Sequence, residues 1–279
     1  MVAVALGLAA GISWGVADFL GGLKSRQLSV LVVLVVSQAV GAVLVGVIIV
    51  ARGEGPPATE YLLIGALAGL SGLAGLAAFY RGMAVGAMSV VAPISATGAA
   101  IPVTVGIATG DRPRAVQVAG LVLALVGVVL ASREAREGSA GTKVAAGTGL
   151  ALVAAVGFGG FFVGLDLASE GDVLWALLAA RSVDIVLLVA VGLALRPGHD
   201  LSARDLRDLA AVGVFDVAAN ALFAFASTQG LVSLVAVLAS LYPVTTIFLA
   251  RLVLKESVRT SQAVGVALAL LGVAAIAAG

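Results

Sequence analysis

The chain has 279 residues, of which 61% are hydrophobic and 11% are charged, and its mean hydropathy is +1.18. Soluble domains carry about 25% charged residues because their surfaces face water. This composition therefore excludes a soluble enzyme, a nucleic-acid-binding protein and a disordered chain. A helix crosses the hydrocarbon core with about 20 apolar residues, so the composition predicts a polytopic protein whose main partner is the lipid bilayer.

Charge and cysteine content narrow the class further. The 16 Lys and Arg residues nearly balance the 15 Asp and Glu residues, so net charge indicates no anionic partner. Cysteine is absent, and the single histidine, His199, lies in a polar stretch. We therefore expect no disulfide, no metal site and no cofactor. Motifs of hydrolases, metalloproteases and P-loop proteins are absent as well, which predicts a protein that is not an enzyme.

Apolar runs between charged or Pro- and Gly-containing boundaries predict ten membrane-spanning helices, separated by connections too short for a soluble domain. In chain order these spans lie near residues 2–22, 29–51, 61–82, 86–109, 115–132, 144–166, 173–196, 206–228, 231–253 and 260–278. Ser202 followed by Asp205 forms a capping box, which indicates where the eighth helix opens.

The chain contains an internal repeat. The first and sixth spans align at an offset of 142 residues, and the fifth and tenth at 145, with the pairs Gly7/Gly149, Gly15/Gly157, Phe19/Phe161, Gln117/Gln262 and Gly120/Gly265. Ser89 and Ser233 match at 144. We interpret this order as a duplication, with one repeat at 1–132, a linker at 133–143 and a second repeat at 144–279.

A repeat of five helices has a consequence for topology. Because five is odd, the second copy enters the membrane from the side opposite to the first. The predicted fold is therefore an all-α integral membrane protein built of two inverted five-helix repeats. This architecture is typical of secondary transporters, which open a central site alternately to either side.

The order of several short motifs resembles the drug/metabolite transporter superfamily, and within it the EamA-like ten-helix family. The motifs are Trp14-Gly15 with Phe19, the segment Ser89–Pro93, and Leu254-Lys255-Glu256 followed by Gln262 and Gly265. The first half departs from the pattern, because Gly110-Asp111-Arg112 stands where a Gly-Glu-Arg-like turn is usual. The resemblance implies export or exchange of small metabolites and leaves the substrate open.

Ionisable side chains inside the spans are the first candidates for function, because charges at membrane depth are costly. Arg181 and Asp184 lie in the seventh span and Asp216 in the eighth, with Asn220 one turn further on. Asp18 continues a stripe of glycines in the first span, so we expect it to face protein or a cavity rather than lipid.

Each of these side chains also has a structural interpretation. Arg181 and Asp184 share a helix face and would neutralise each other, alone or with Asp216. Asp18 would lie at the membrane interface, close to Lys24. Our hypothesis is that Asp216 is a coupling or substrate-binding carboxylate.

Interrupted helices are the second candidates. The fourth span contains Pro93, Gly98 and Pro102, and the ninth contains Pro243, which aligns with Gly98 at the 145 offset. Paired interruptions near mid-membrane indicate a transporter's binding site. The alternative is a pair of kinks that serve packing alone.

Other polar and aromatic side chains lie deep within the spans. Trp14 and Tyr242 are deeper than an interfacial aromatic belt, and Gln38 and Ser95 are polar residues of the second and fourth spans. These residues either contact a substrate or only pack, and the sequence leaves both open.

Most Lys and Arg residues fall on one side of the predicted topology. By the positive-inside rule this side is cytoplasmic and both termini lie outside. We expect a multi-pass protein of the plasma membrane, in bacteria the inner membrane, that exports a small-molecule substrate as a monomer or homodimer. Alternatives are an uptake permease and a non-transporting membrane scaffold.

Overall fold

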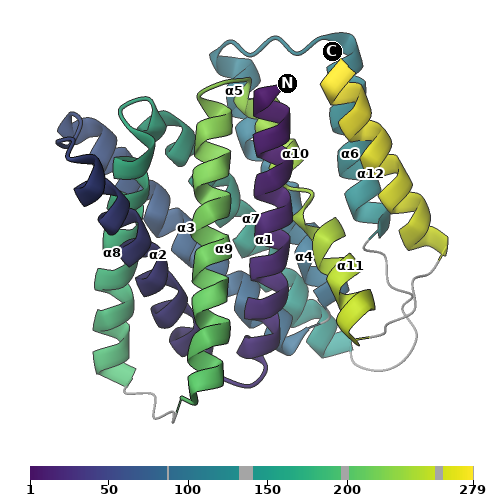
Figure 1. Ribbon diagram of the computed structural model, residues 1–279. Helices are drawn as coiled ribbons and strands as arrows, with labels where there is room; N and C mark the ends of the chain where they lie inside the picture. The colour runs from purple at the N-terminus through teal and green to yellow at the C-terminus, as the bar shows by residue number, and fades with distance from the viewer. Residues whose placement is uncertain (87, 132–140, 196–200, 255–259, 279) are drawn as a thin grey trace.

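The computed structural model describes residues 1–86, 88–131, 141–195, 201–254 and 260–278. Every regular element in these ranges is helical (Figure 1). The elements are α1 (Val2–Ser25), α2 (Val30–Arg52), α3 (Thr59–Val85), α4 (Met88–Ala96), the 3₁₀ turn η1 (Thr97–Ala99), α5 (Ala100–Thr109), α6 (Ala115–Ala131), α7 (Gly141–Ser169), α8 (Val173–Leu195), α9 (Ala203–Ser227), α10 (Val232–Ala239), α11 (Tyr242–Leu254) and α12 (Thr260–Ala278).

Six helices in the described ranges are long and apolar enough to cross a membrane: α1, α2, α3, α7 from Gly147, α8 and α9. The apolar stretches Ile94–Thr109, Ala115–Gly127 and Val232–Thr246 are shorter. The predicted spans agree with the observed helix ends to within three residues. Ser202 and Asp205 form the expected capping box at the start of α9.

Both predicted interruptions are present. The segment predicted as the fourth span divides into α4, η1 and α5, and the segment predicted as the ninth divides into α10 and α11 with Ser240 and Leu241 between them. Gly98 lies in η1, where an added Cβ would be 2.2 Å from the backbone oxygen of Ala155. Glycine is required there because α7 packs directly on the backbone.

One detail of the prediction is wrong. Pro93 lies inside α4 and ends no helix, because a single missing backbone hydrogen bond is tolerated in a membrane helix. The expected linker 133–143 overlaps the start of α7, which begins at Gly141. Backbone hydrogen bonding extends a helix beyond its apolar segment. Residues 133–140 of that linker, His199 and the Lys255–Glu256 pair lie outside the described residues.

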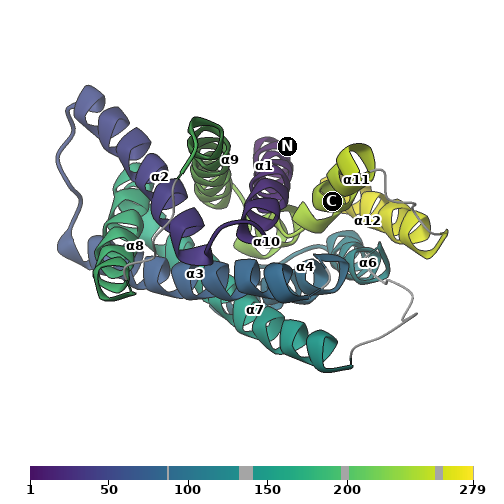
Figure 2. The ribbon, with the colours of Figure 1, turned by 90° about the horizontal axis from the view of Figure 1, so that it is seen from below.

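The helices pack in two groups that meet in the middle of the molecule. In one group α3 contacts α7 and α8, and in the other α1 contacts α9, α10 and α11. Helix α2 contacts both α8 and α9. Figure 2 shows α6 and α12 side by side at the edge of the bundle, remote from α2 and α8. The start of α1 and the end of α12 lie at the same end of the bundle (Figure 1).

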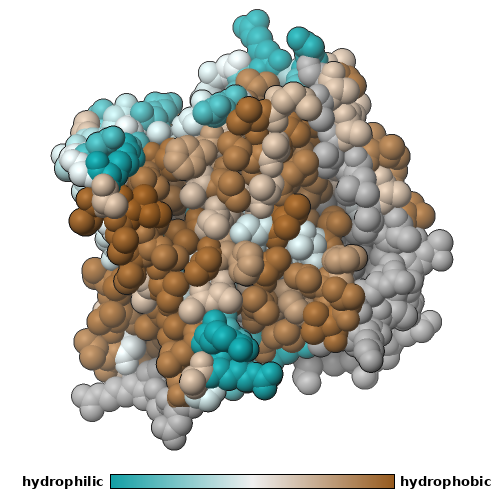
Figure 3. Space-filling model, in the orientation of Figure 1, coloured by the Kyte–Doolittle hydropathy of each residue, from teal (hydrophilic) through white to brown (hydrophobic). Residues whose placement is uncertain are grey.

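The surface along the helices is apolar. Val50 on α2, Leu193 on α8 and Leu67 on α3 are 81%, 71% and 65% exposed. Figure 3 shows this face as a largely hydrophobic surface with hydrophilic patches toward its two ends. An exposed apolar surface of this extent indicates contact with lipid.

Ion pairs join helices near both ends of the bundle. Lys24 at the end of α1 contacts Asp205 at 2.8 Å and Asp208 at 2.9 Å in the first turns of α9. At the opposite end, Arg52 of α2 contacts Asp172 at 2.6 Å, and Asp172 accepts the backbone N–H of Trp175 at the start of α8.

The Arg52–Asp172 contact predicts a pH dependence of stability. Burial raises the pKa of Asp172, but the hydrogen bonds from Arg52 and from the Trp175 N–H lower it more, so its pKa lies below the usual value. The resulting stabilisation is complete above the unfolded-state pKa of about 3.9 and is lost as pH falls through the folded-state pKa. We expect Asp172→Asn to flatten the acid limb of unfolding curves recorded in detergent. Identical acid limbs would contradict this.

Candidate functional site

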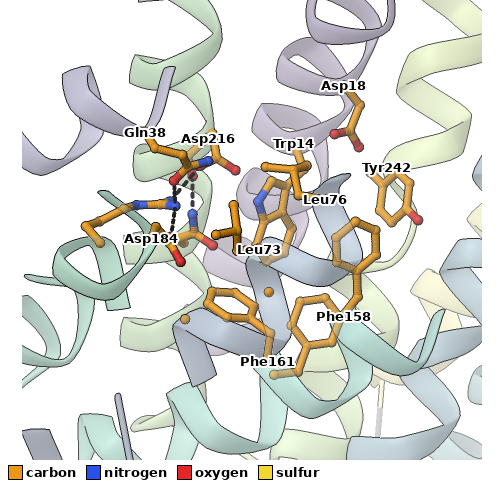
Figure 4. Close-up of a pocket in the computed structure, with 15 residues that line it drawn as sticks. Trp14, Asp18, Gln38, Leu73, Leu76, Phe158, Phe161, Asp184, Asp216 and Tyr242 are labelled. Atoms are coloured by element: carbon orange, nitrogen blue, oxygen red, sulfur yellow. Dashed lines mark hydrogen bonds and ion pairs between the residues drawn. The ribbon is translucent and has the colours of Figure 1, made fainter. Parts of the chain in front are cut away.

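A pocket lies between the two helix groups (Figure 4), and most of its lining residues are near the middle of their helices. Its walls come from α1, α2, α3, α7, α8, α9 and α11, so they combine both halves of the chain. The lining residues are Trp14, Asp18, Gln38, Gly69, Gly72, Leu73, Leu76, Phe158, Phe161, Phe162, Arg181, Asp184, Asp216, Asn220 and Tyr242.

Arg181 is the centre of a buried polar cluster. Its Nη2 donates to the Asp216 carboxylate at 2.6 Å, and its Nη1 donates to Asp184 at 3.4 Å and to the Gln38 side-chain oxygen. Both members of the Arg181–Asp216 pair are nearly inaccessible, at 7% and 12% side-chain exposure. The Arg181–Asp216 pair links α8 to α9, and the Arg181–Gln38 contact links α8 to α2. The predicted contact between Arg181, Asp184 and Asp216 is therefore present.

The cluster leaves several polar atoms without a partner. Nε of Arg181, Nε2 of Gln38 and Oδ1 of Asp184 are buried and make no hydrogen bond within the described residues. Buried polar atoms are normally satisfied, and exceptions often mark the place of a water or ligand. These three unpaired atoms belong to side chains that form the polar wall of the pocket.

Asp18 lines the same pocket but is not part of the Arg181 cluster. The residue is 5% exposed, and it makes no hydrogen bond or ion pair within the described part of the chain. An added Cβ would lie 2.9 Å from Ala239 O at Gly11 and 2.4 Å from Thr245 Cβ at Gly15. The glycine stripe therefore packs on α10 and α11, and Asp18 on the same helix faces the pocket.

Aromatic rings form much of the remaining wall. Trp14 lies 5.3 Å from Phe162 and 5.9 Å from Phe223, and Phe162 stacks on Phe223 at 4.7 Å between ring centroids. The sequence reasoning missed Phe158, Phe161 and Phe162 of α7. A signal was present, because Phe161 is the repeat partner of Phe19 in a dense aromatic segment.

Three predicted residues have mainly structural contacts. Asn220 donates to the backbone oxygen of Asp216 at 2.8 Å within α9, although it also lines the pocket. The Tyr242 hydroxyl donates to Ala92 O at 3.2 Å and joins α11 to α4. Ser95 is buried, donates to the carbonyl of its own helix at 2.8 Å, and is not among the pocket-lining residues.

The pocket carries more negative than positive groups. Among its described lining residues, Asp18, Asp184 and Asp216 face one guanidinium, that of Arg181. Within the ranges that the structure describes, no group of three or more His, Cys, Asp or Glu side chains could hold a metal ion. What the arrangement offers is a polar wall with an acidic excess opposite an aromatic wall, midway along the helices.

The chain belongs to the EamA-like transporter family, which matches it over residues 1–133 and 145–278. This family is part of the drug/metabolite transporter superfamily, whose members are membrane transporters and not enzymes. The predicted family is confirmed, and the protein is a multi-pass membrane protein. No curated protein matches the chain.

Comparison with solved structures supports the fold, since 22 chains match. One of them, described only as the crystal structure of a protein, has a TM-score of 0.76 at 18% identity. The alignment covers 98% of this chain and 95% of that one. At that identity the similarity concerns the fold alone.

Proposed function

We propose that the protein is a secondary transporter of the plasma membrane that exports small metabolites, amino-acid-like or drug-like, by alternating access. The observation that carries this proposal is the pocket midway along the helices, lined from both halves of the chain and holding buried charges. A charged cluster in the hydrocarbon region is costly and is typical of a substrate or ion pathway. A purely structural membrane protein has no need for such a cluster beside a cavity.

The proposed architecture is two inverted five-helix repeats, with α4, η1 and α5 as one span and α10 and α11 as another. The helix contacts support this. Exchanging the repeats converts the α1–α9 contact into the α7–α3 contact and the α2–α9 contact into the α8–α3 contact. The α6–α12 contact maps onto itself. Such a pattern is expected of a pseudo-two-fold axis in the membrane plane.

Glycine positions support the same symmetry. An added Cβ on Gly69 of α3 would lie 2.6 Å from Ala180 of α8, and one on Gly213 of α9 would lie 2.3 Å from the Ser37 oxygen of α2. The two glycines are 144 residues apart (213 − 69), the offset that relates Ser89 to Ser233. Close backbone approach thus recurs in both halves.

The chemistry of the two repeats differs although their packing is alike. At these offsets Asp18 corresponds to Gly160 and Asp216 corresponds to Gly72. Both carboxylates therefore come from α1 and α9, whereas α3 and α7 present glycine and phenylalanine. A substrate would meet one acidic wall and one aromatic wall.

Arg181 is the coupling element in this scheme of alternating access. It belongs to α8 but holds Asp216 of α9 and Gln38 of α2, so it ties the two helix groups together. A solute or a proton bound at Asp216 would weaken the Arg181–Asp216 contact and favour movement of one helix group relative to the other. Proton-coupled transport and facilitated exchange are both compatible with this scheme.

The test of this function compares metabolites in cells with and without the protein and then measures flux in proteoliposomes. We expect export of at least one small solute, driven by a proton or solute gradient. Net uptake under the same gradients would favour a permease. Absence of any metabolite difference and of any flux would favour a scaffold and contradict the proposal.

Asp216→Asn should reduce this flux at least about tenfold, because the buried Arg181 loses its charged partner. Asp216→Glu should retain more activity than Asp216→Asn, and the exposed Glu60→Gln in α3 is the matched control. Size-exclusion profiles confirm folding of each variant. Wild-type rate and pH dependence for Asp216→Asn would refute a coupling or binding role of this carboxylate.

Orientation is part of the proposal. Lys24, Arg81, Arg204 and Arg207 lie near the ends of α1 and α3 and the start of α9, at the end of the bundle opposite to the chain termini. The positive-inside rule then places the termini outside. A reporter fused after Gly279 should be active outside the cytoplasm, and a cytoplasmic signal would reverse the assignment.

A further inference from the structure

The unpaired carboxylate of Asp18 is the feature of the pocket that the transport scheme leaves unexplained. Asp184 and Asp216 share Arg181, whereas Asp18 has no ion-pair or hydrogen-bond partner within the described residues. A buried ion without a partner is strongly destabilised, so a proton or a cation must neutralise it. The pocket therefore has a place for one positive charge.

The surroundings of Asp18 are aromatic. In Figure 4 Asp18 lies near Trp14 and Tyr242, on the side away from Gln38 and Asp184. Aromatic faces attract organic cations, with Trp the strongest partner. A hard metal ion would instead require several oxygen ligands around it, and the described residues offer no such group.

We propose that the pocket binds organic cations with an aromatic or apolar body, and that Asp18 is their counter-charge while Trp14 packs against the body. The proposal rests on the proposed transport function for its physiological meaning, since the bound cation would be the cargo. Three carboxylates against one guanidinium among the described lining residues disfavour an anion, and the phenylalanines of α7 provide the apolar surface for the body.

Calorimetry on the purified protein tests the inference, with nanodiscs of uncharged phosphatidylcholine preventing adsorption of cations to the lipid. The probes share one shape and differ in charge: 2-phenylethylammonium, 2-phenylethanol and 3-phenylpropionate. We expect the cation to bind at least about tenfold more tightly than the alcohol, because a buried charge pair replaces an unpaired charge. The carboxylate probe should bind most weakly.

Variants assign the charge to its residue. Asp18→Asn should abolish the preference for the cation over the alcohol, Asp18→Glu should restore most of it, and the exposed Glu60→Gln should leave it unchanged. The protein has two tryptophans, so Trp175→Phe leaves Trp14 as the only indole, and its fluorescence should respond to the cation. Should Asp18→Asn fail to fold, the order of the three probes on the unmodified protein still decides the sign of the charge.

Two results would overturn the inference: equal or tighter binding of 3-phenylpropionate, or an unchanged cation preference in folded Asp18→Asn. Absence of cation binding would mean that a proton alone neutralises Asp18, which also overturns it. Proteoliposome flux separates this outcome from failure of the transport proposal. Flux of a neutral or anionic solute without cation binding would support the transport proposal and contradict the cation site. Cation binding without any flux would support the cation site and contradict the transport proposal.

Discussion

Arg181→Gln should lower the free energy of unfolding by about 3–5 kcal/mol, the range expected when one partner of a buried ion pair is removed. In this variant Asp184 and Asp216 face each other without a cation, and Gln38 loses its strongest donor. Denaturation of the purified protein in detergent measures the effect. The matched control is Arg52→Gln at the end of α2, where the arginine is 34% exposed. Its loss should change stability far less, because exposed ion pairs contribute little.

A double variant distinguishes charge from packing. Asp216→Asn combined with Arg181→Gln removes one positive and one negative group, so part of the lost stability should return. A coupling free energy of about 0.5–3 kcal/mol between the two sites is expected for residues in contact. Additive losses would show that the Arg181–Asp216 contact carries no specific interaction and would contradict the central role given to Arg181.

Gly213→Val should prevent α2 and α9 from packing and abolish recovery of folded protein. The added Cβ would lie 2.3 Å from the Ser37 backbone oxygen and 3.0 Å from the Val40 side chain. Because the near atom belongs to the backbone, α2 and α9 must separate, and the displacement of α2 also disturbs the Gln38–Arg181 contact that joins α2 to α8. Gly69→Val, at the repeat-related position, should have a similar effect.

The control for this prediction is another glycine in α2. An added Cβ on Gly46 would meet nothing within 4 Å among the described residues. Gly46→Ala should therefore be neutral or slightly stabilising, by up to about 1 kcal/mol, since alanine favours the helix. Yield of monodisperse protein and melting temperature give the readout. Normal packing of Gly213→Val, or damage by Gly46→Ala equal to that of Gly213→Val, would contradict the observed helix contacts.

Much of the fold could be predicted because lipid restricts the choices. Backbone groups in the hydrocarbon must be paired internally, so each apolar run becomes a helix, and α1, α2 and α8 begin and end close to their predicted limits. Helix ends in polar segments were less predictable. Helix α7 begins at Gly141, before its apolar segment at Gly147, because backbone hydrogen bonding continues a helix beyond the residues that contact lipid.

The candidate site was predictable in its charges and not in its walls. Arg181, Asp184 and Asp216 stand out as ionisable groups inside apolar helices, and the structure brings them together. Phe158 and Phe162 are ordinary membrane-helix residues, and only the packing of α7 on α3 brings them to the pocket. Ser95 was a candidate by its polarity, but its hydroxyl donates to a carbonyl of its own helix and it does not line the pocket. The sequence does not show which serine hydroxyls are used in this way.

The absence of cysteine allows a direct test of alternating access. The chain contains no cysteine, so Leu73→Cys places a single thiol in the pocket, and Glu60→Cys places a control thiol at the exposed, polar start of α3. An impermeant thiol reagent is applied from one side of oriented vesicles, with excess transported solute present or absent. The rate of labelling reports which side reaches the pocket.

If the protein works by alternating access, the pocket thiol of the Leu73→Cys variant reacts from each side in turn. Trapping the protein in one state then blocks the reaction from the other side. Labelling of the Glu60→Cys variant should not change between these states. Reaction of the pocket thiol from both sides at once would indicate an open channel, and failure to react from either side under all conditions would indicate a closed scaffold. Either result would contradict a secondary transporter.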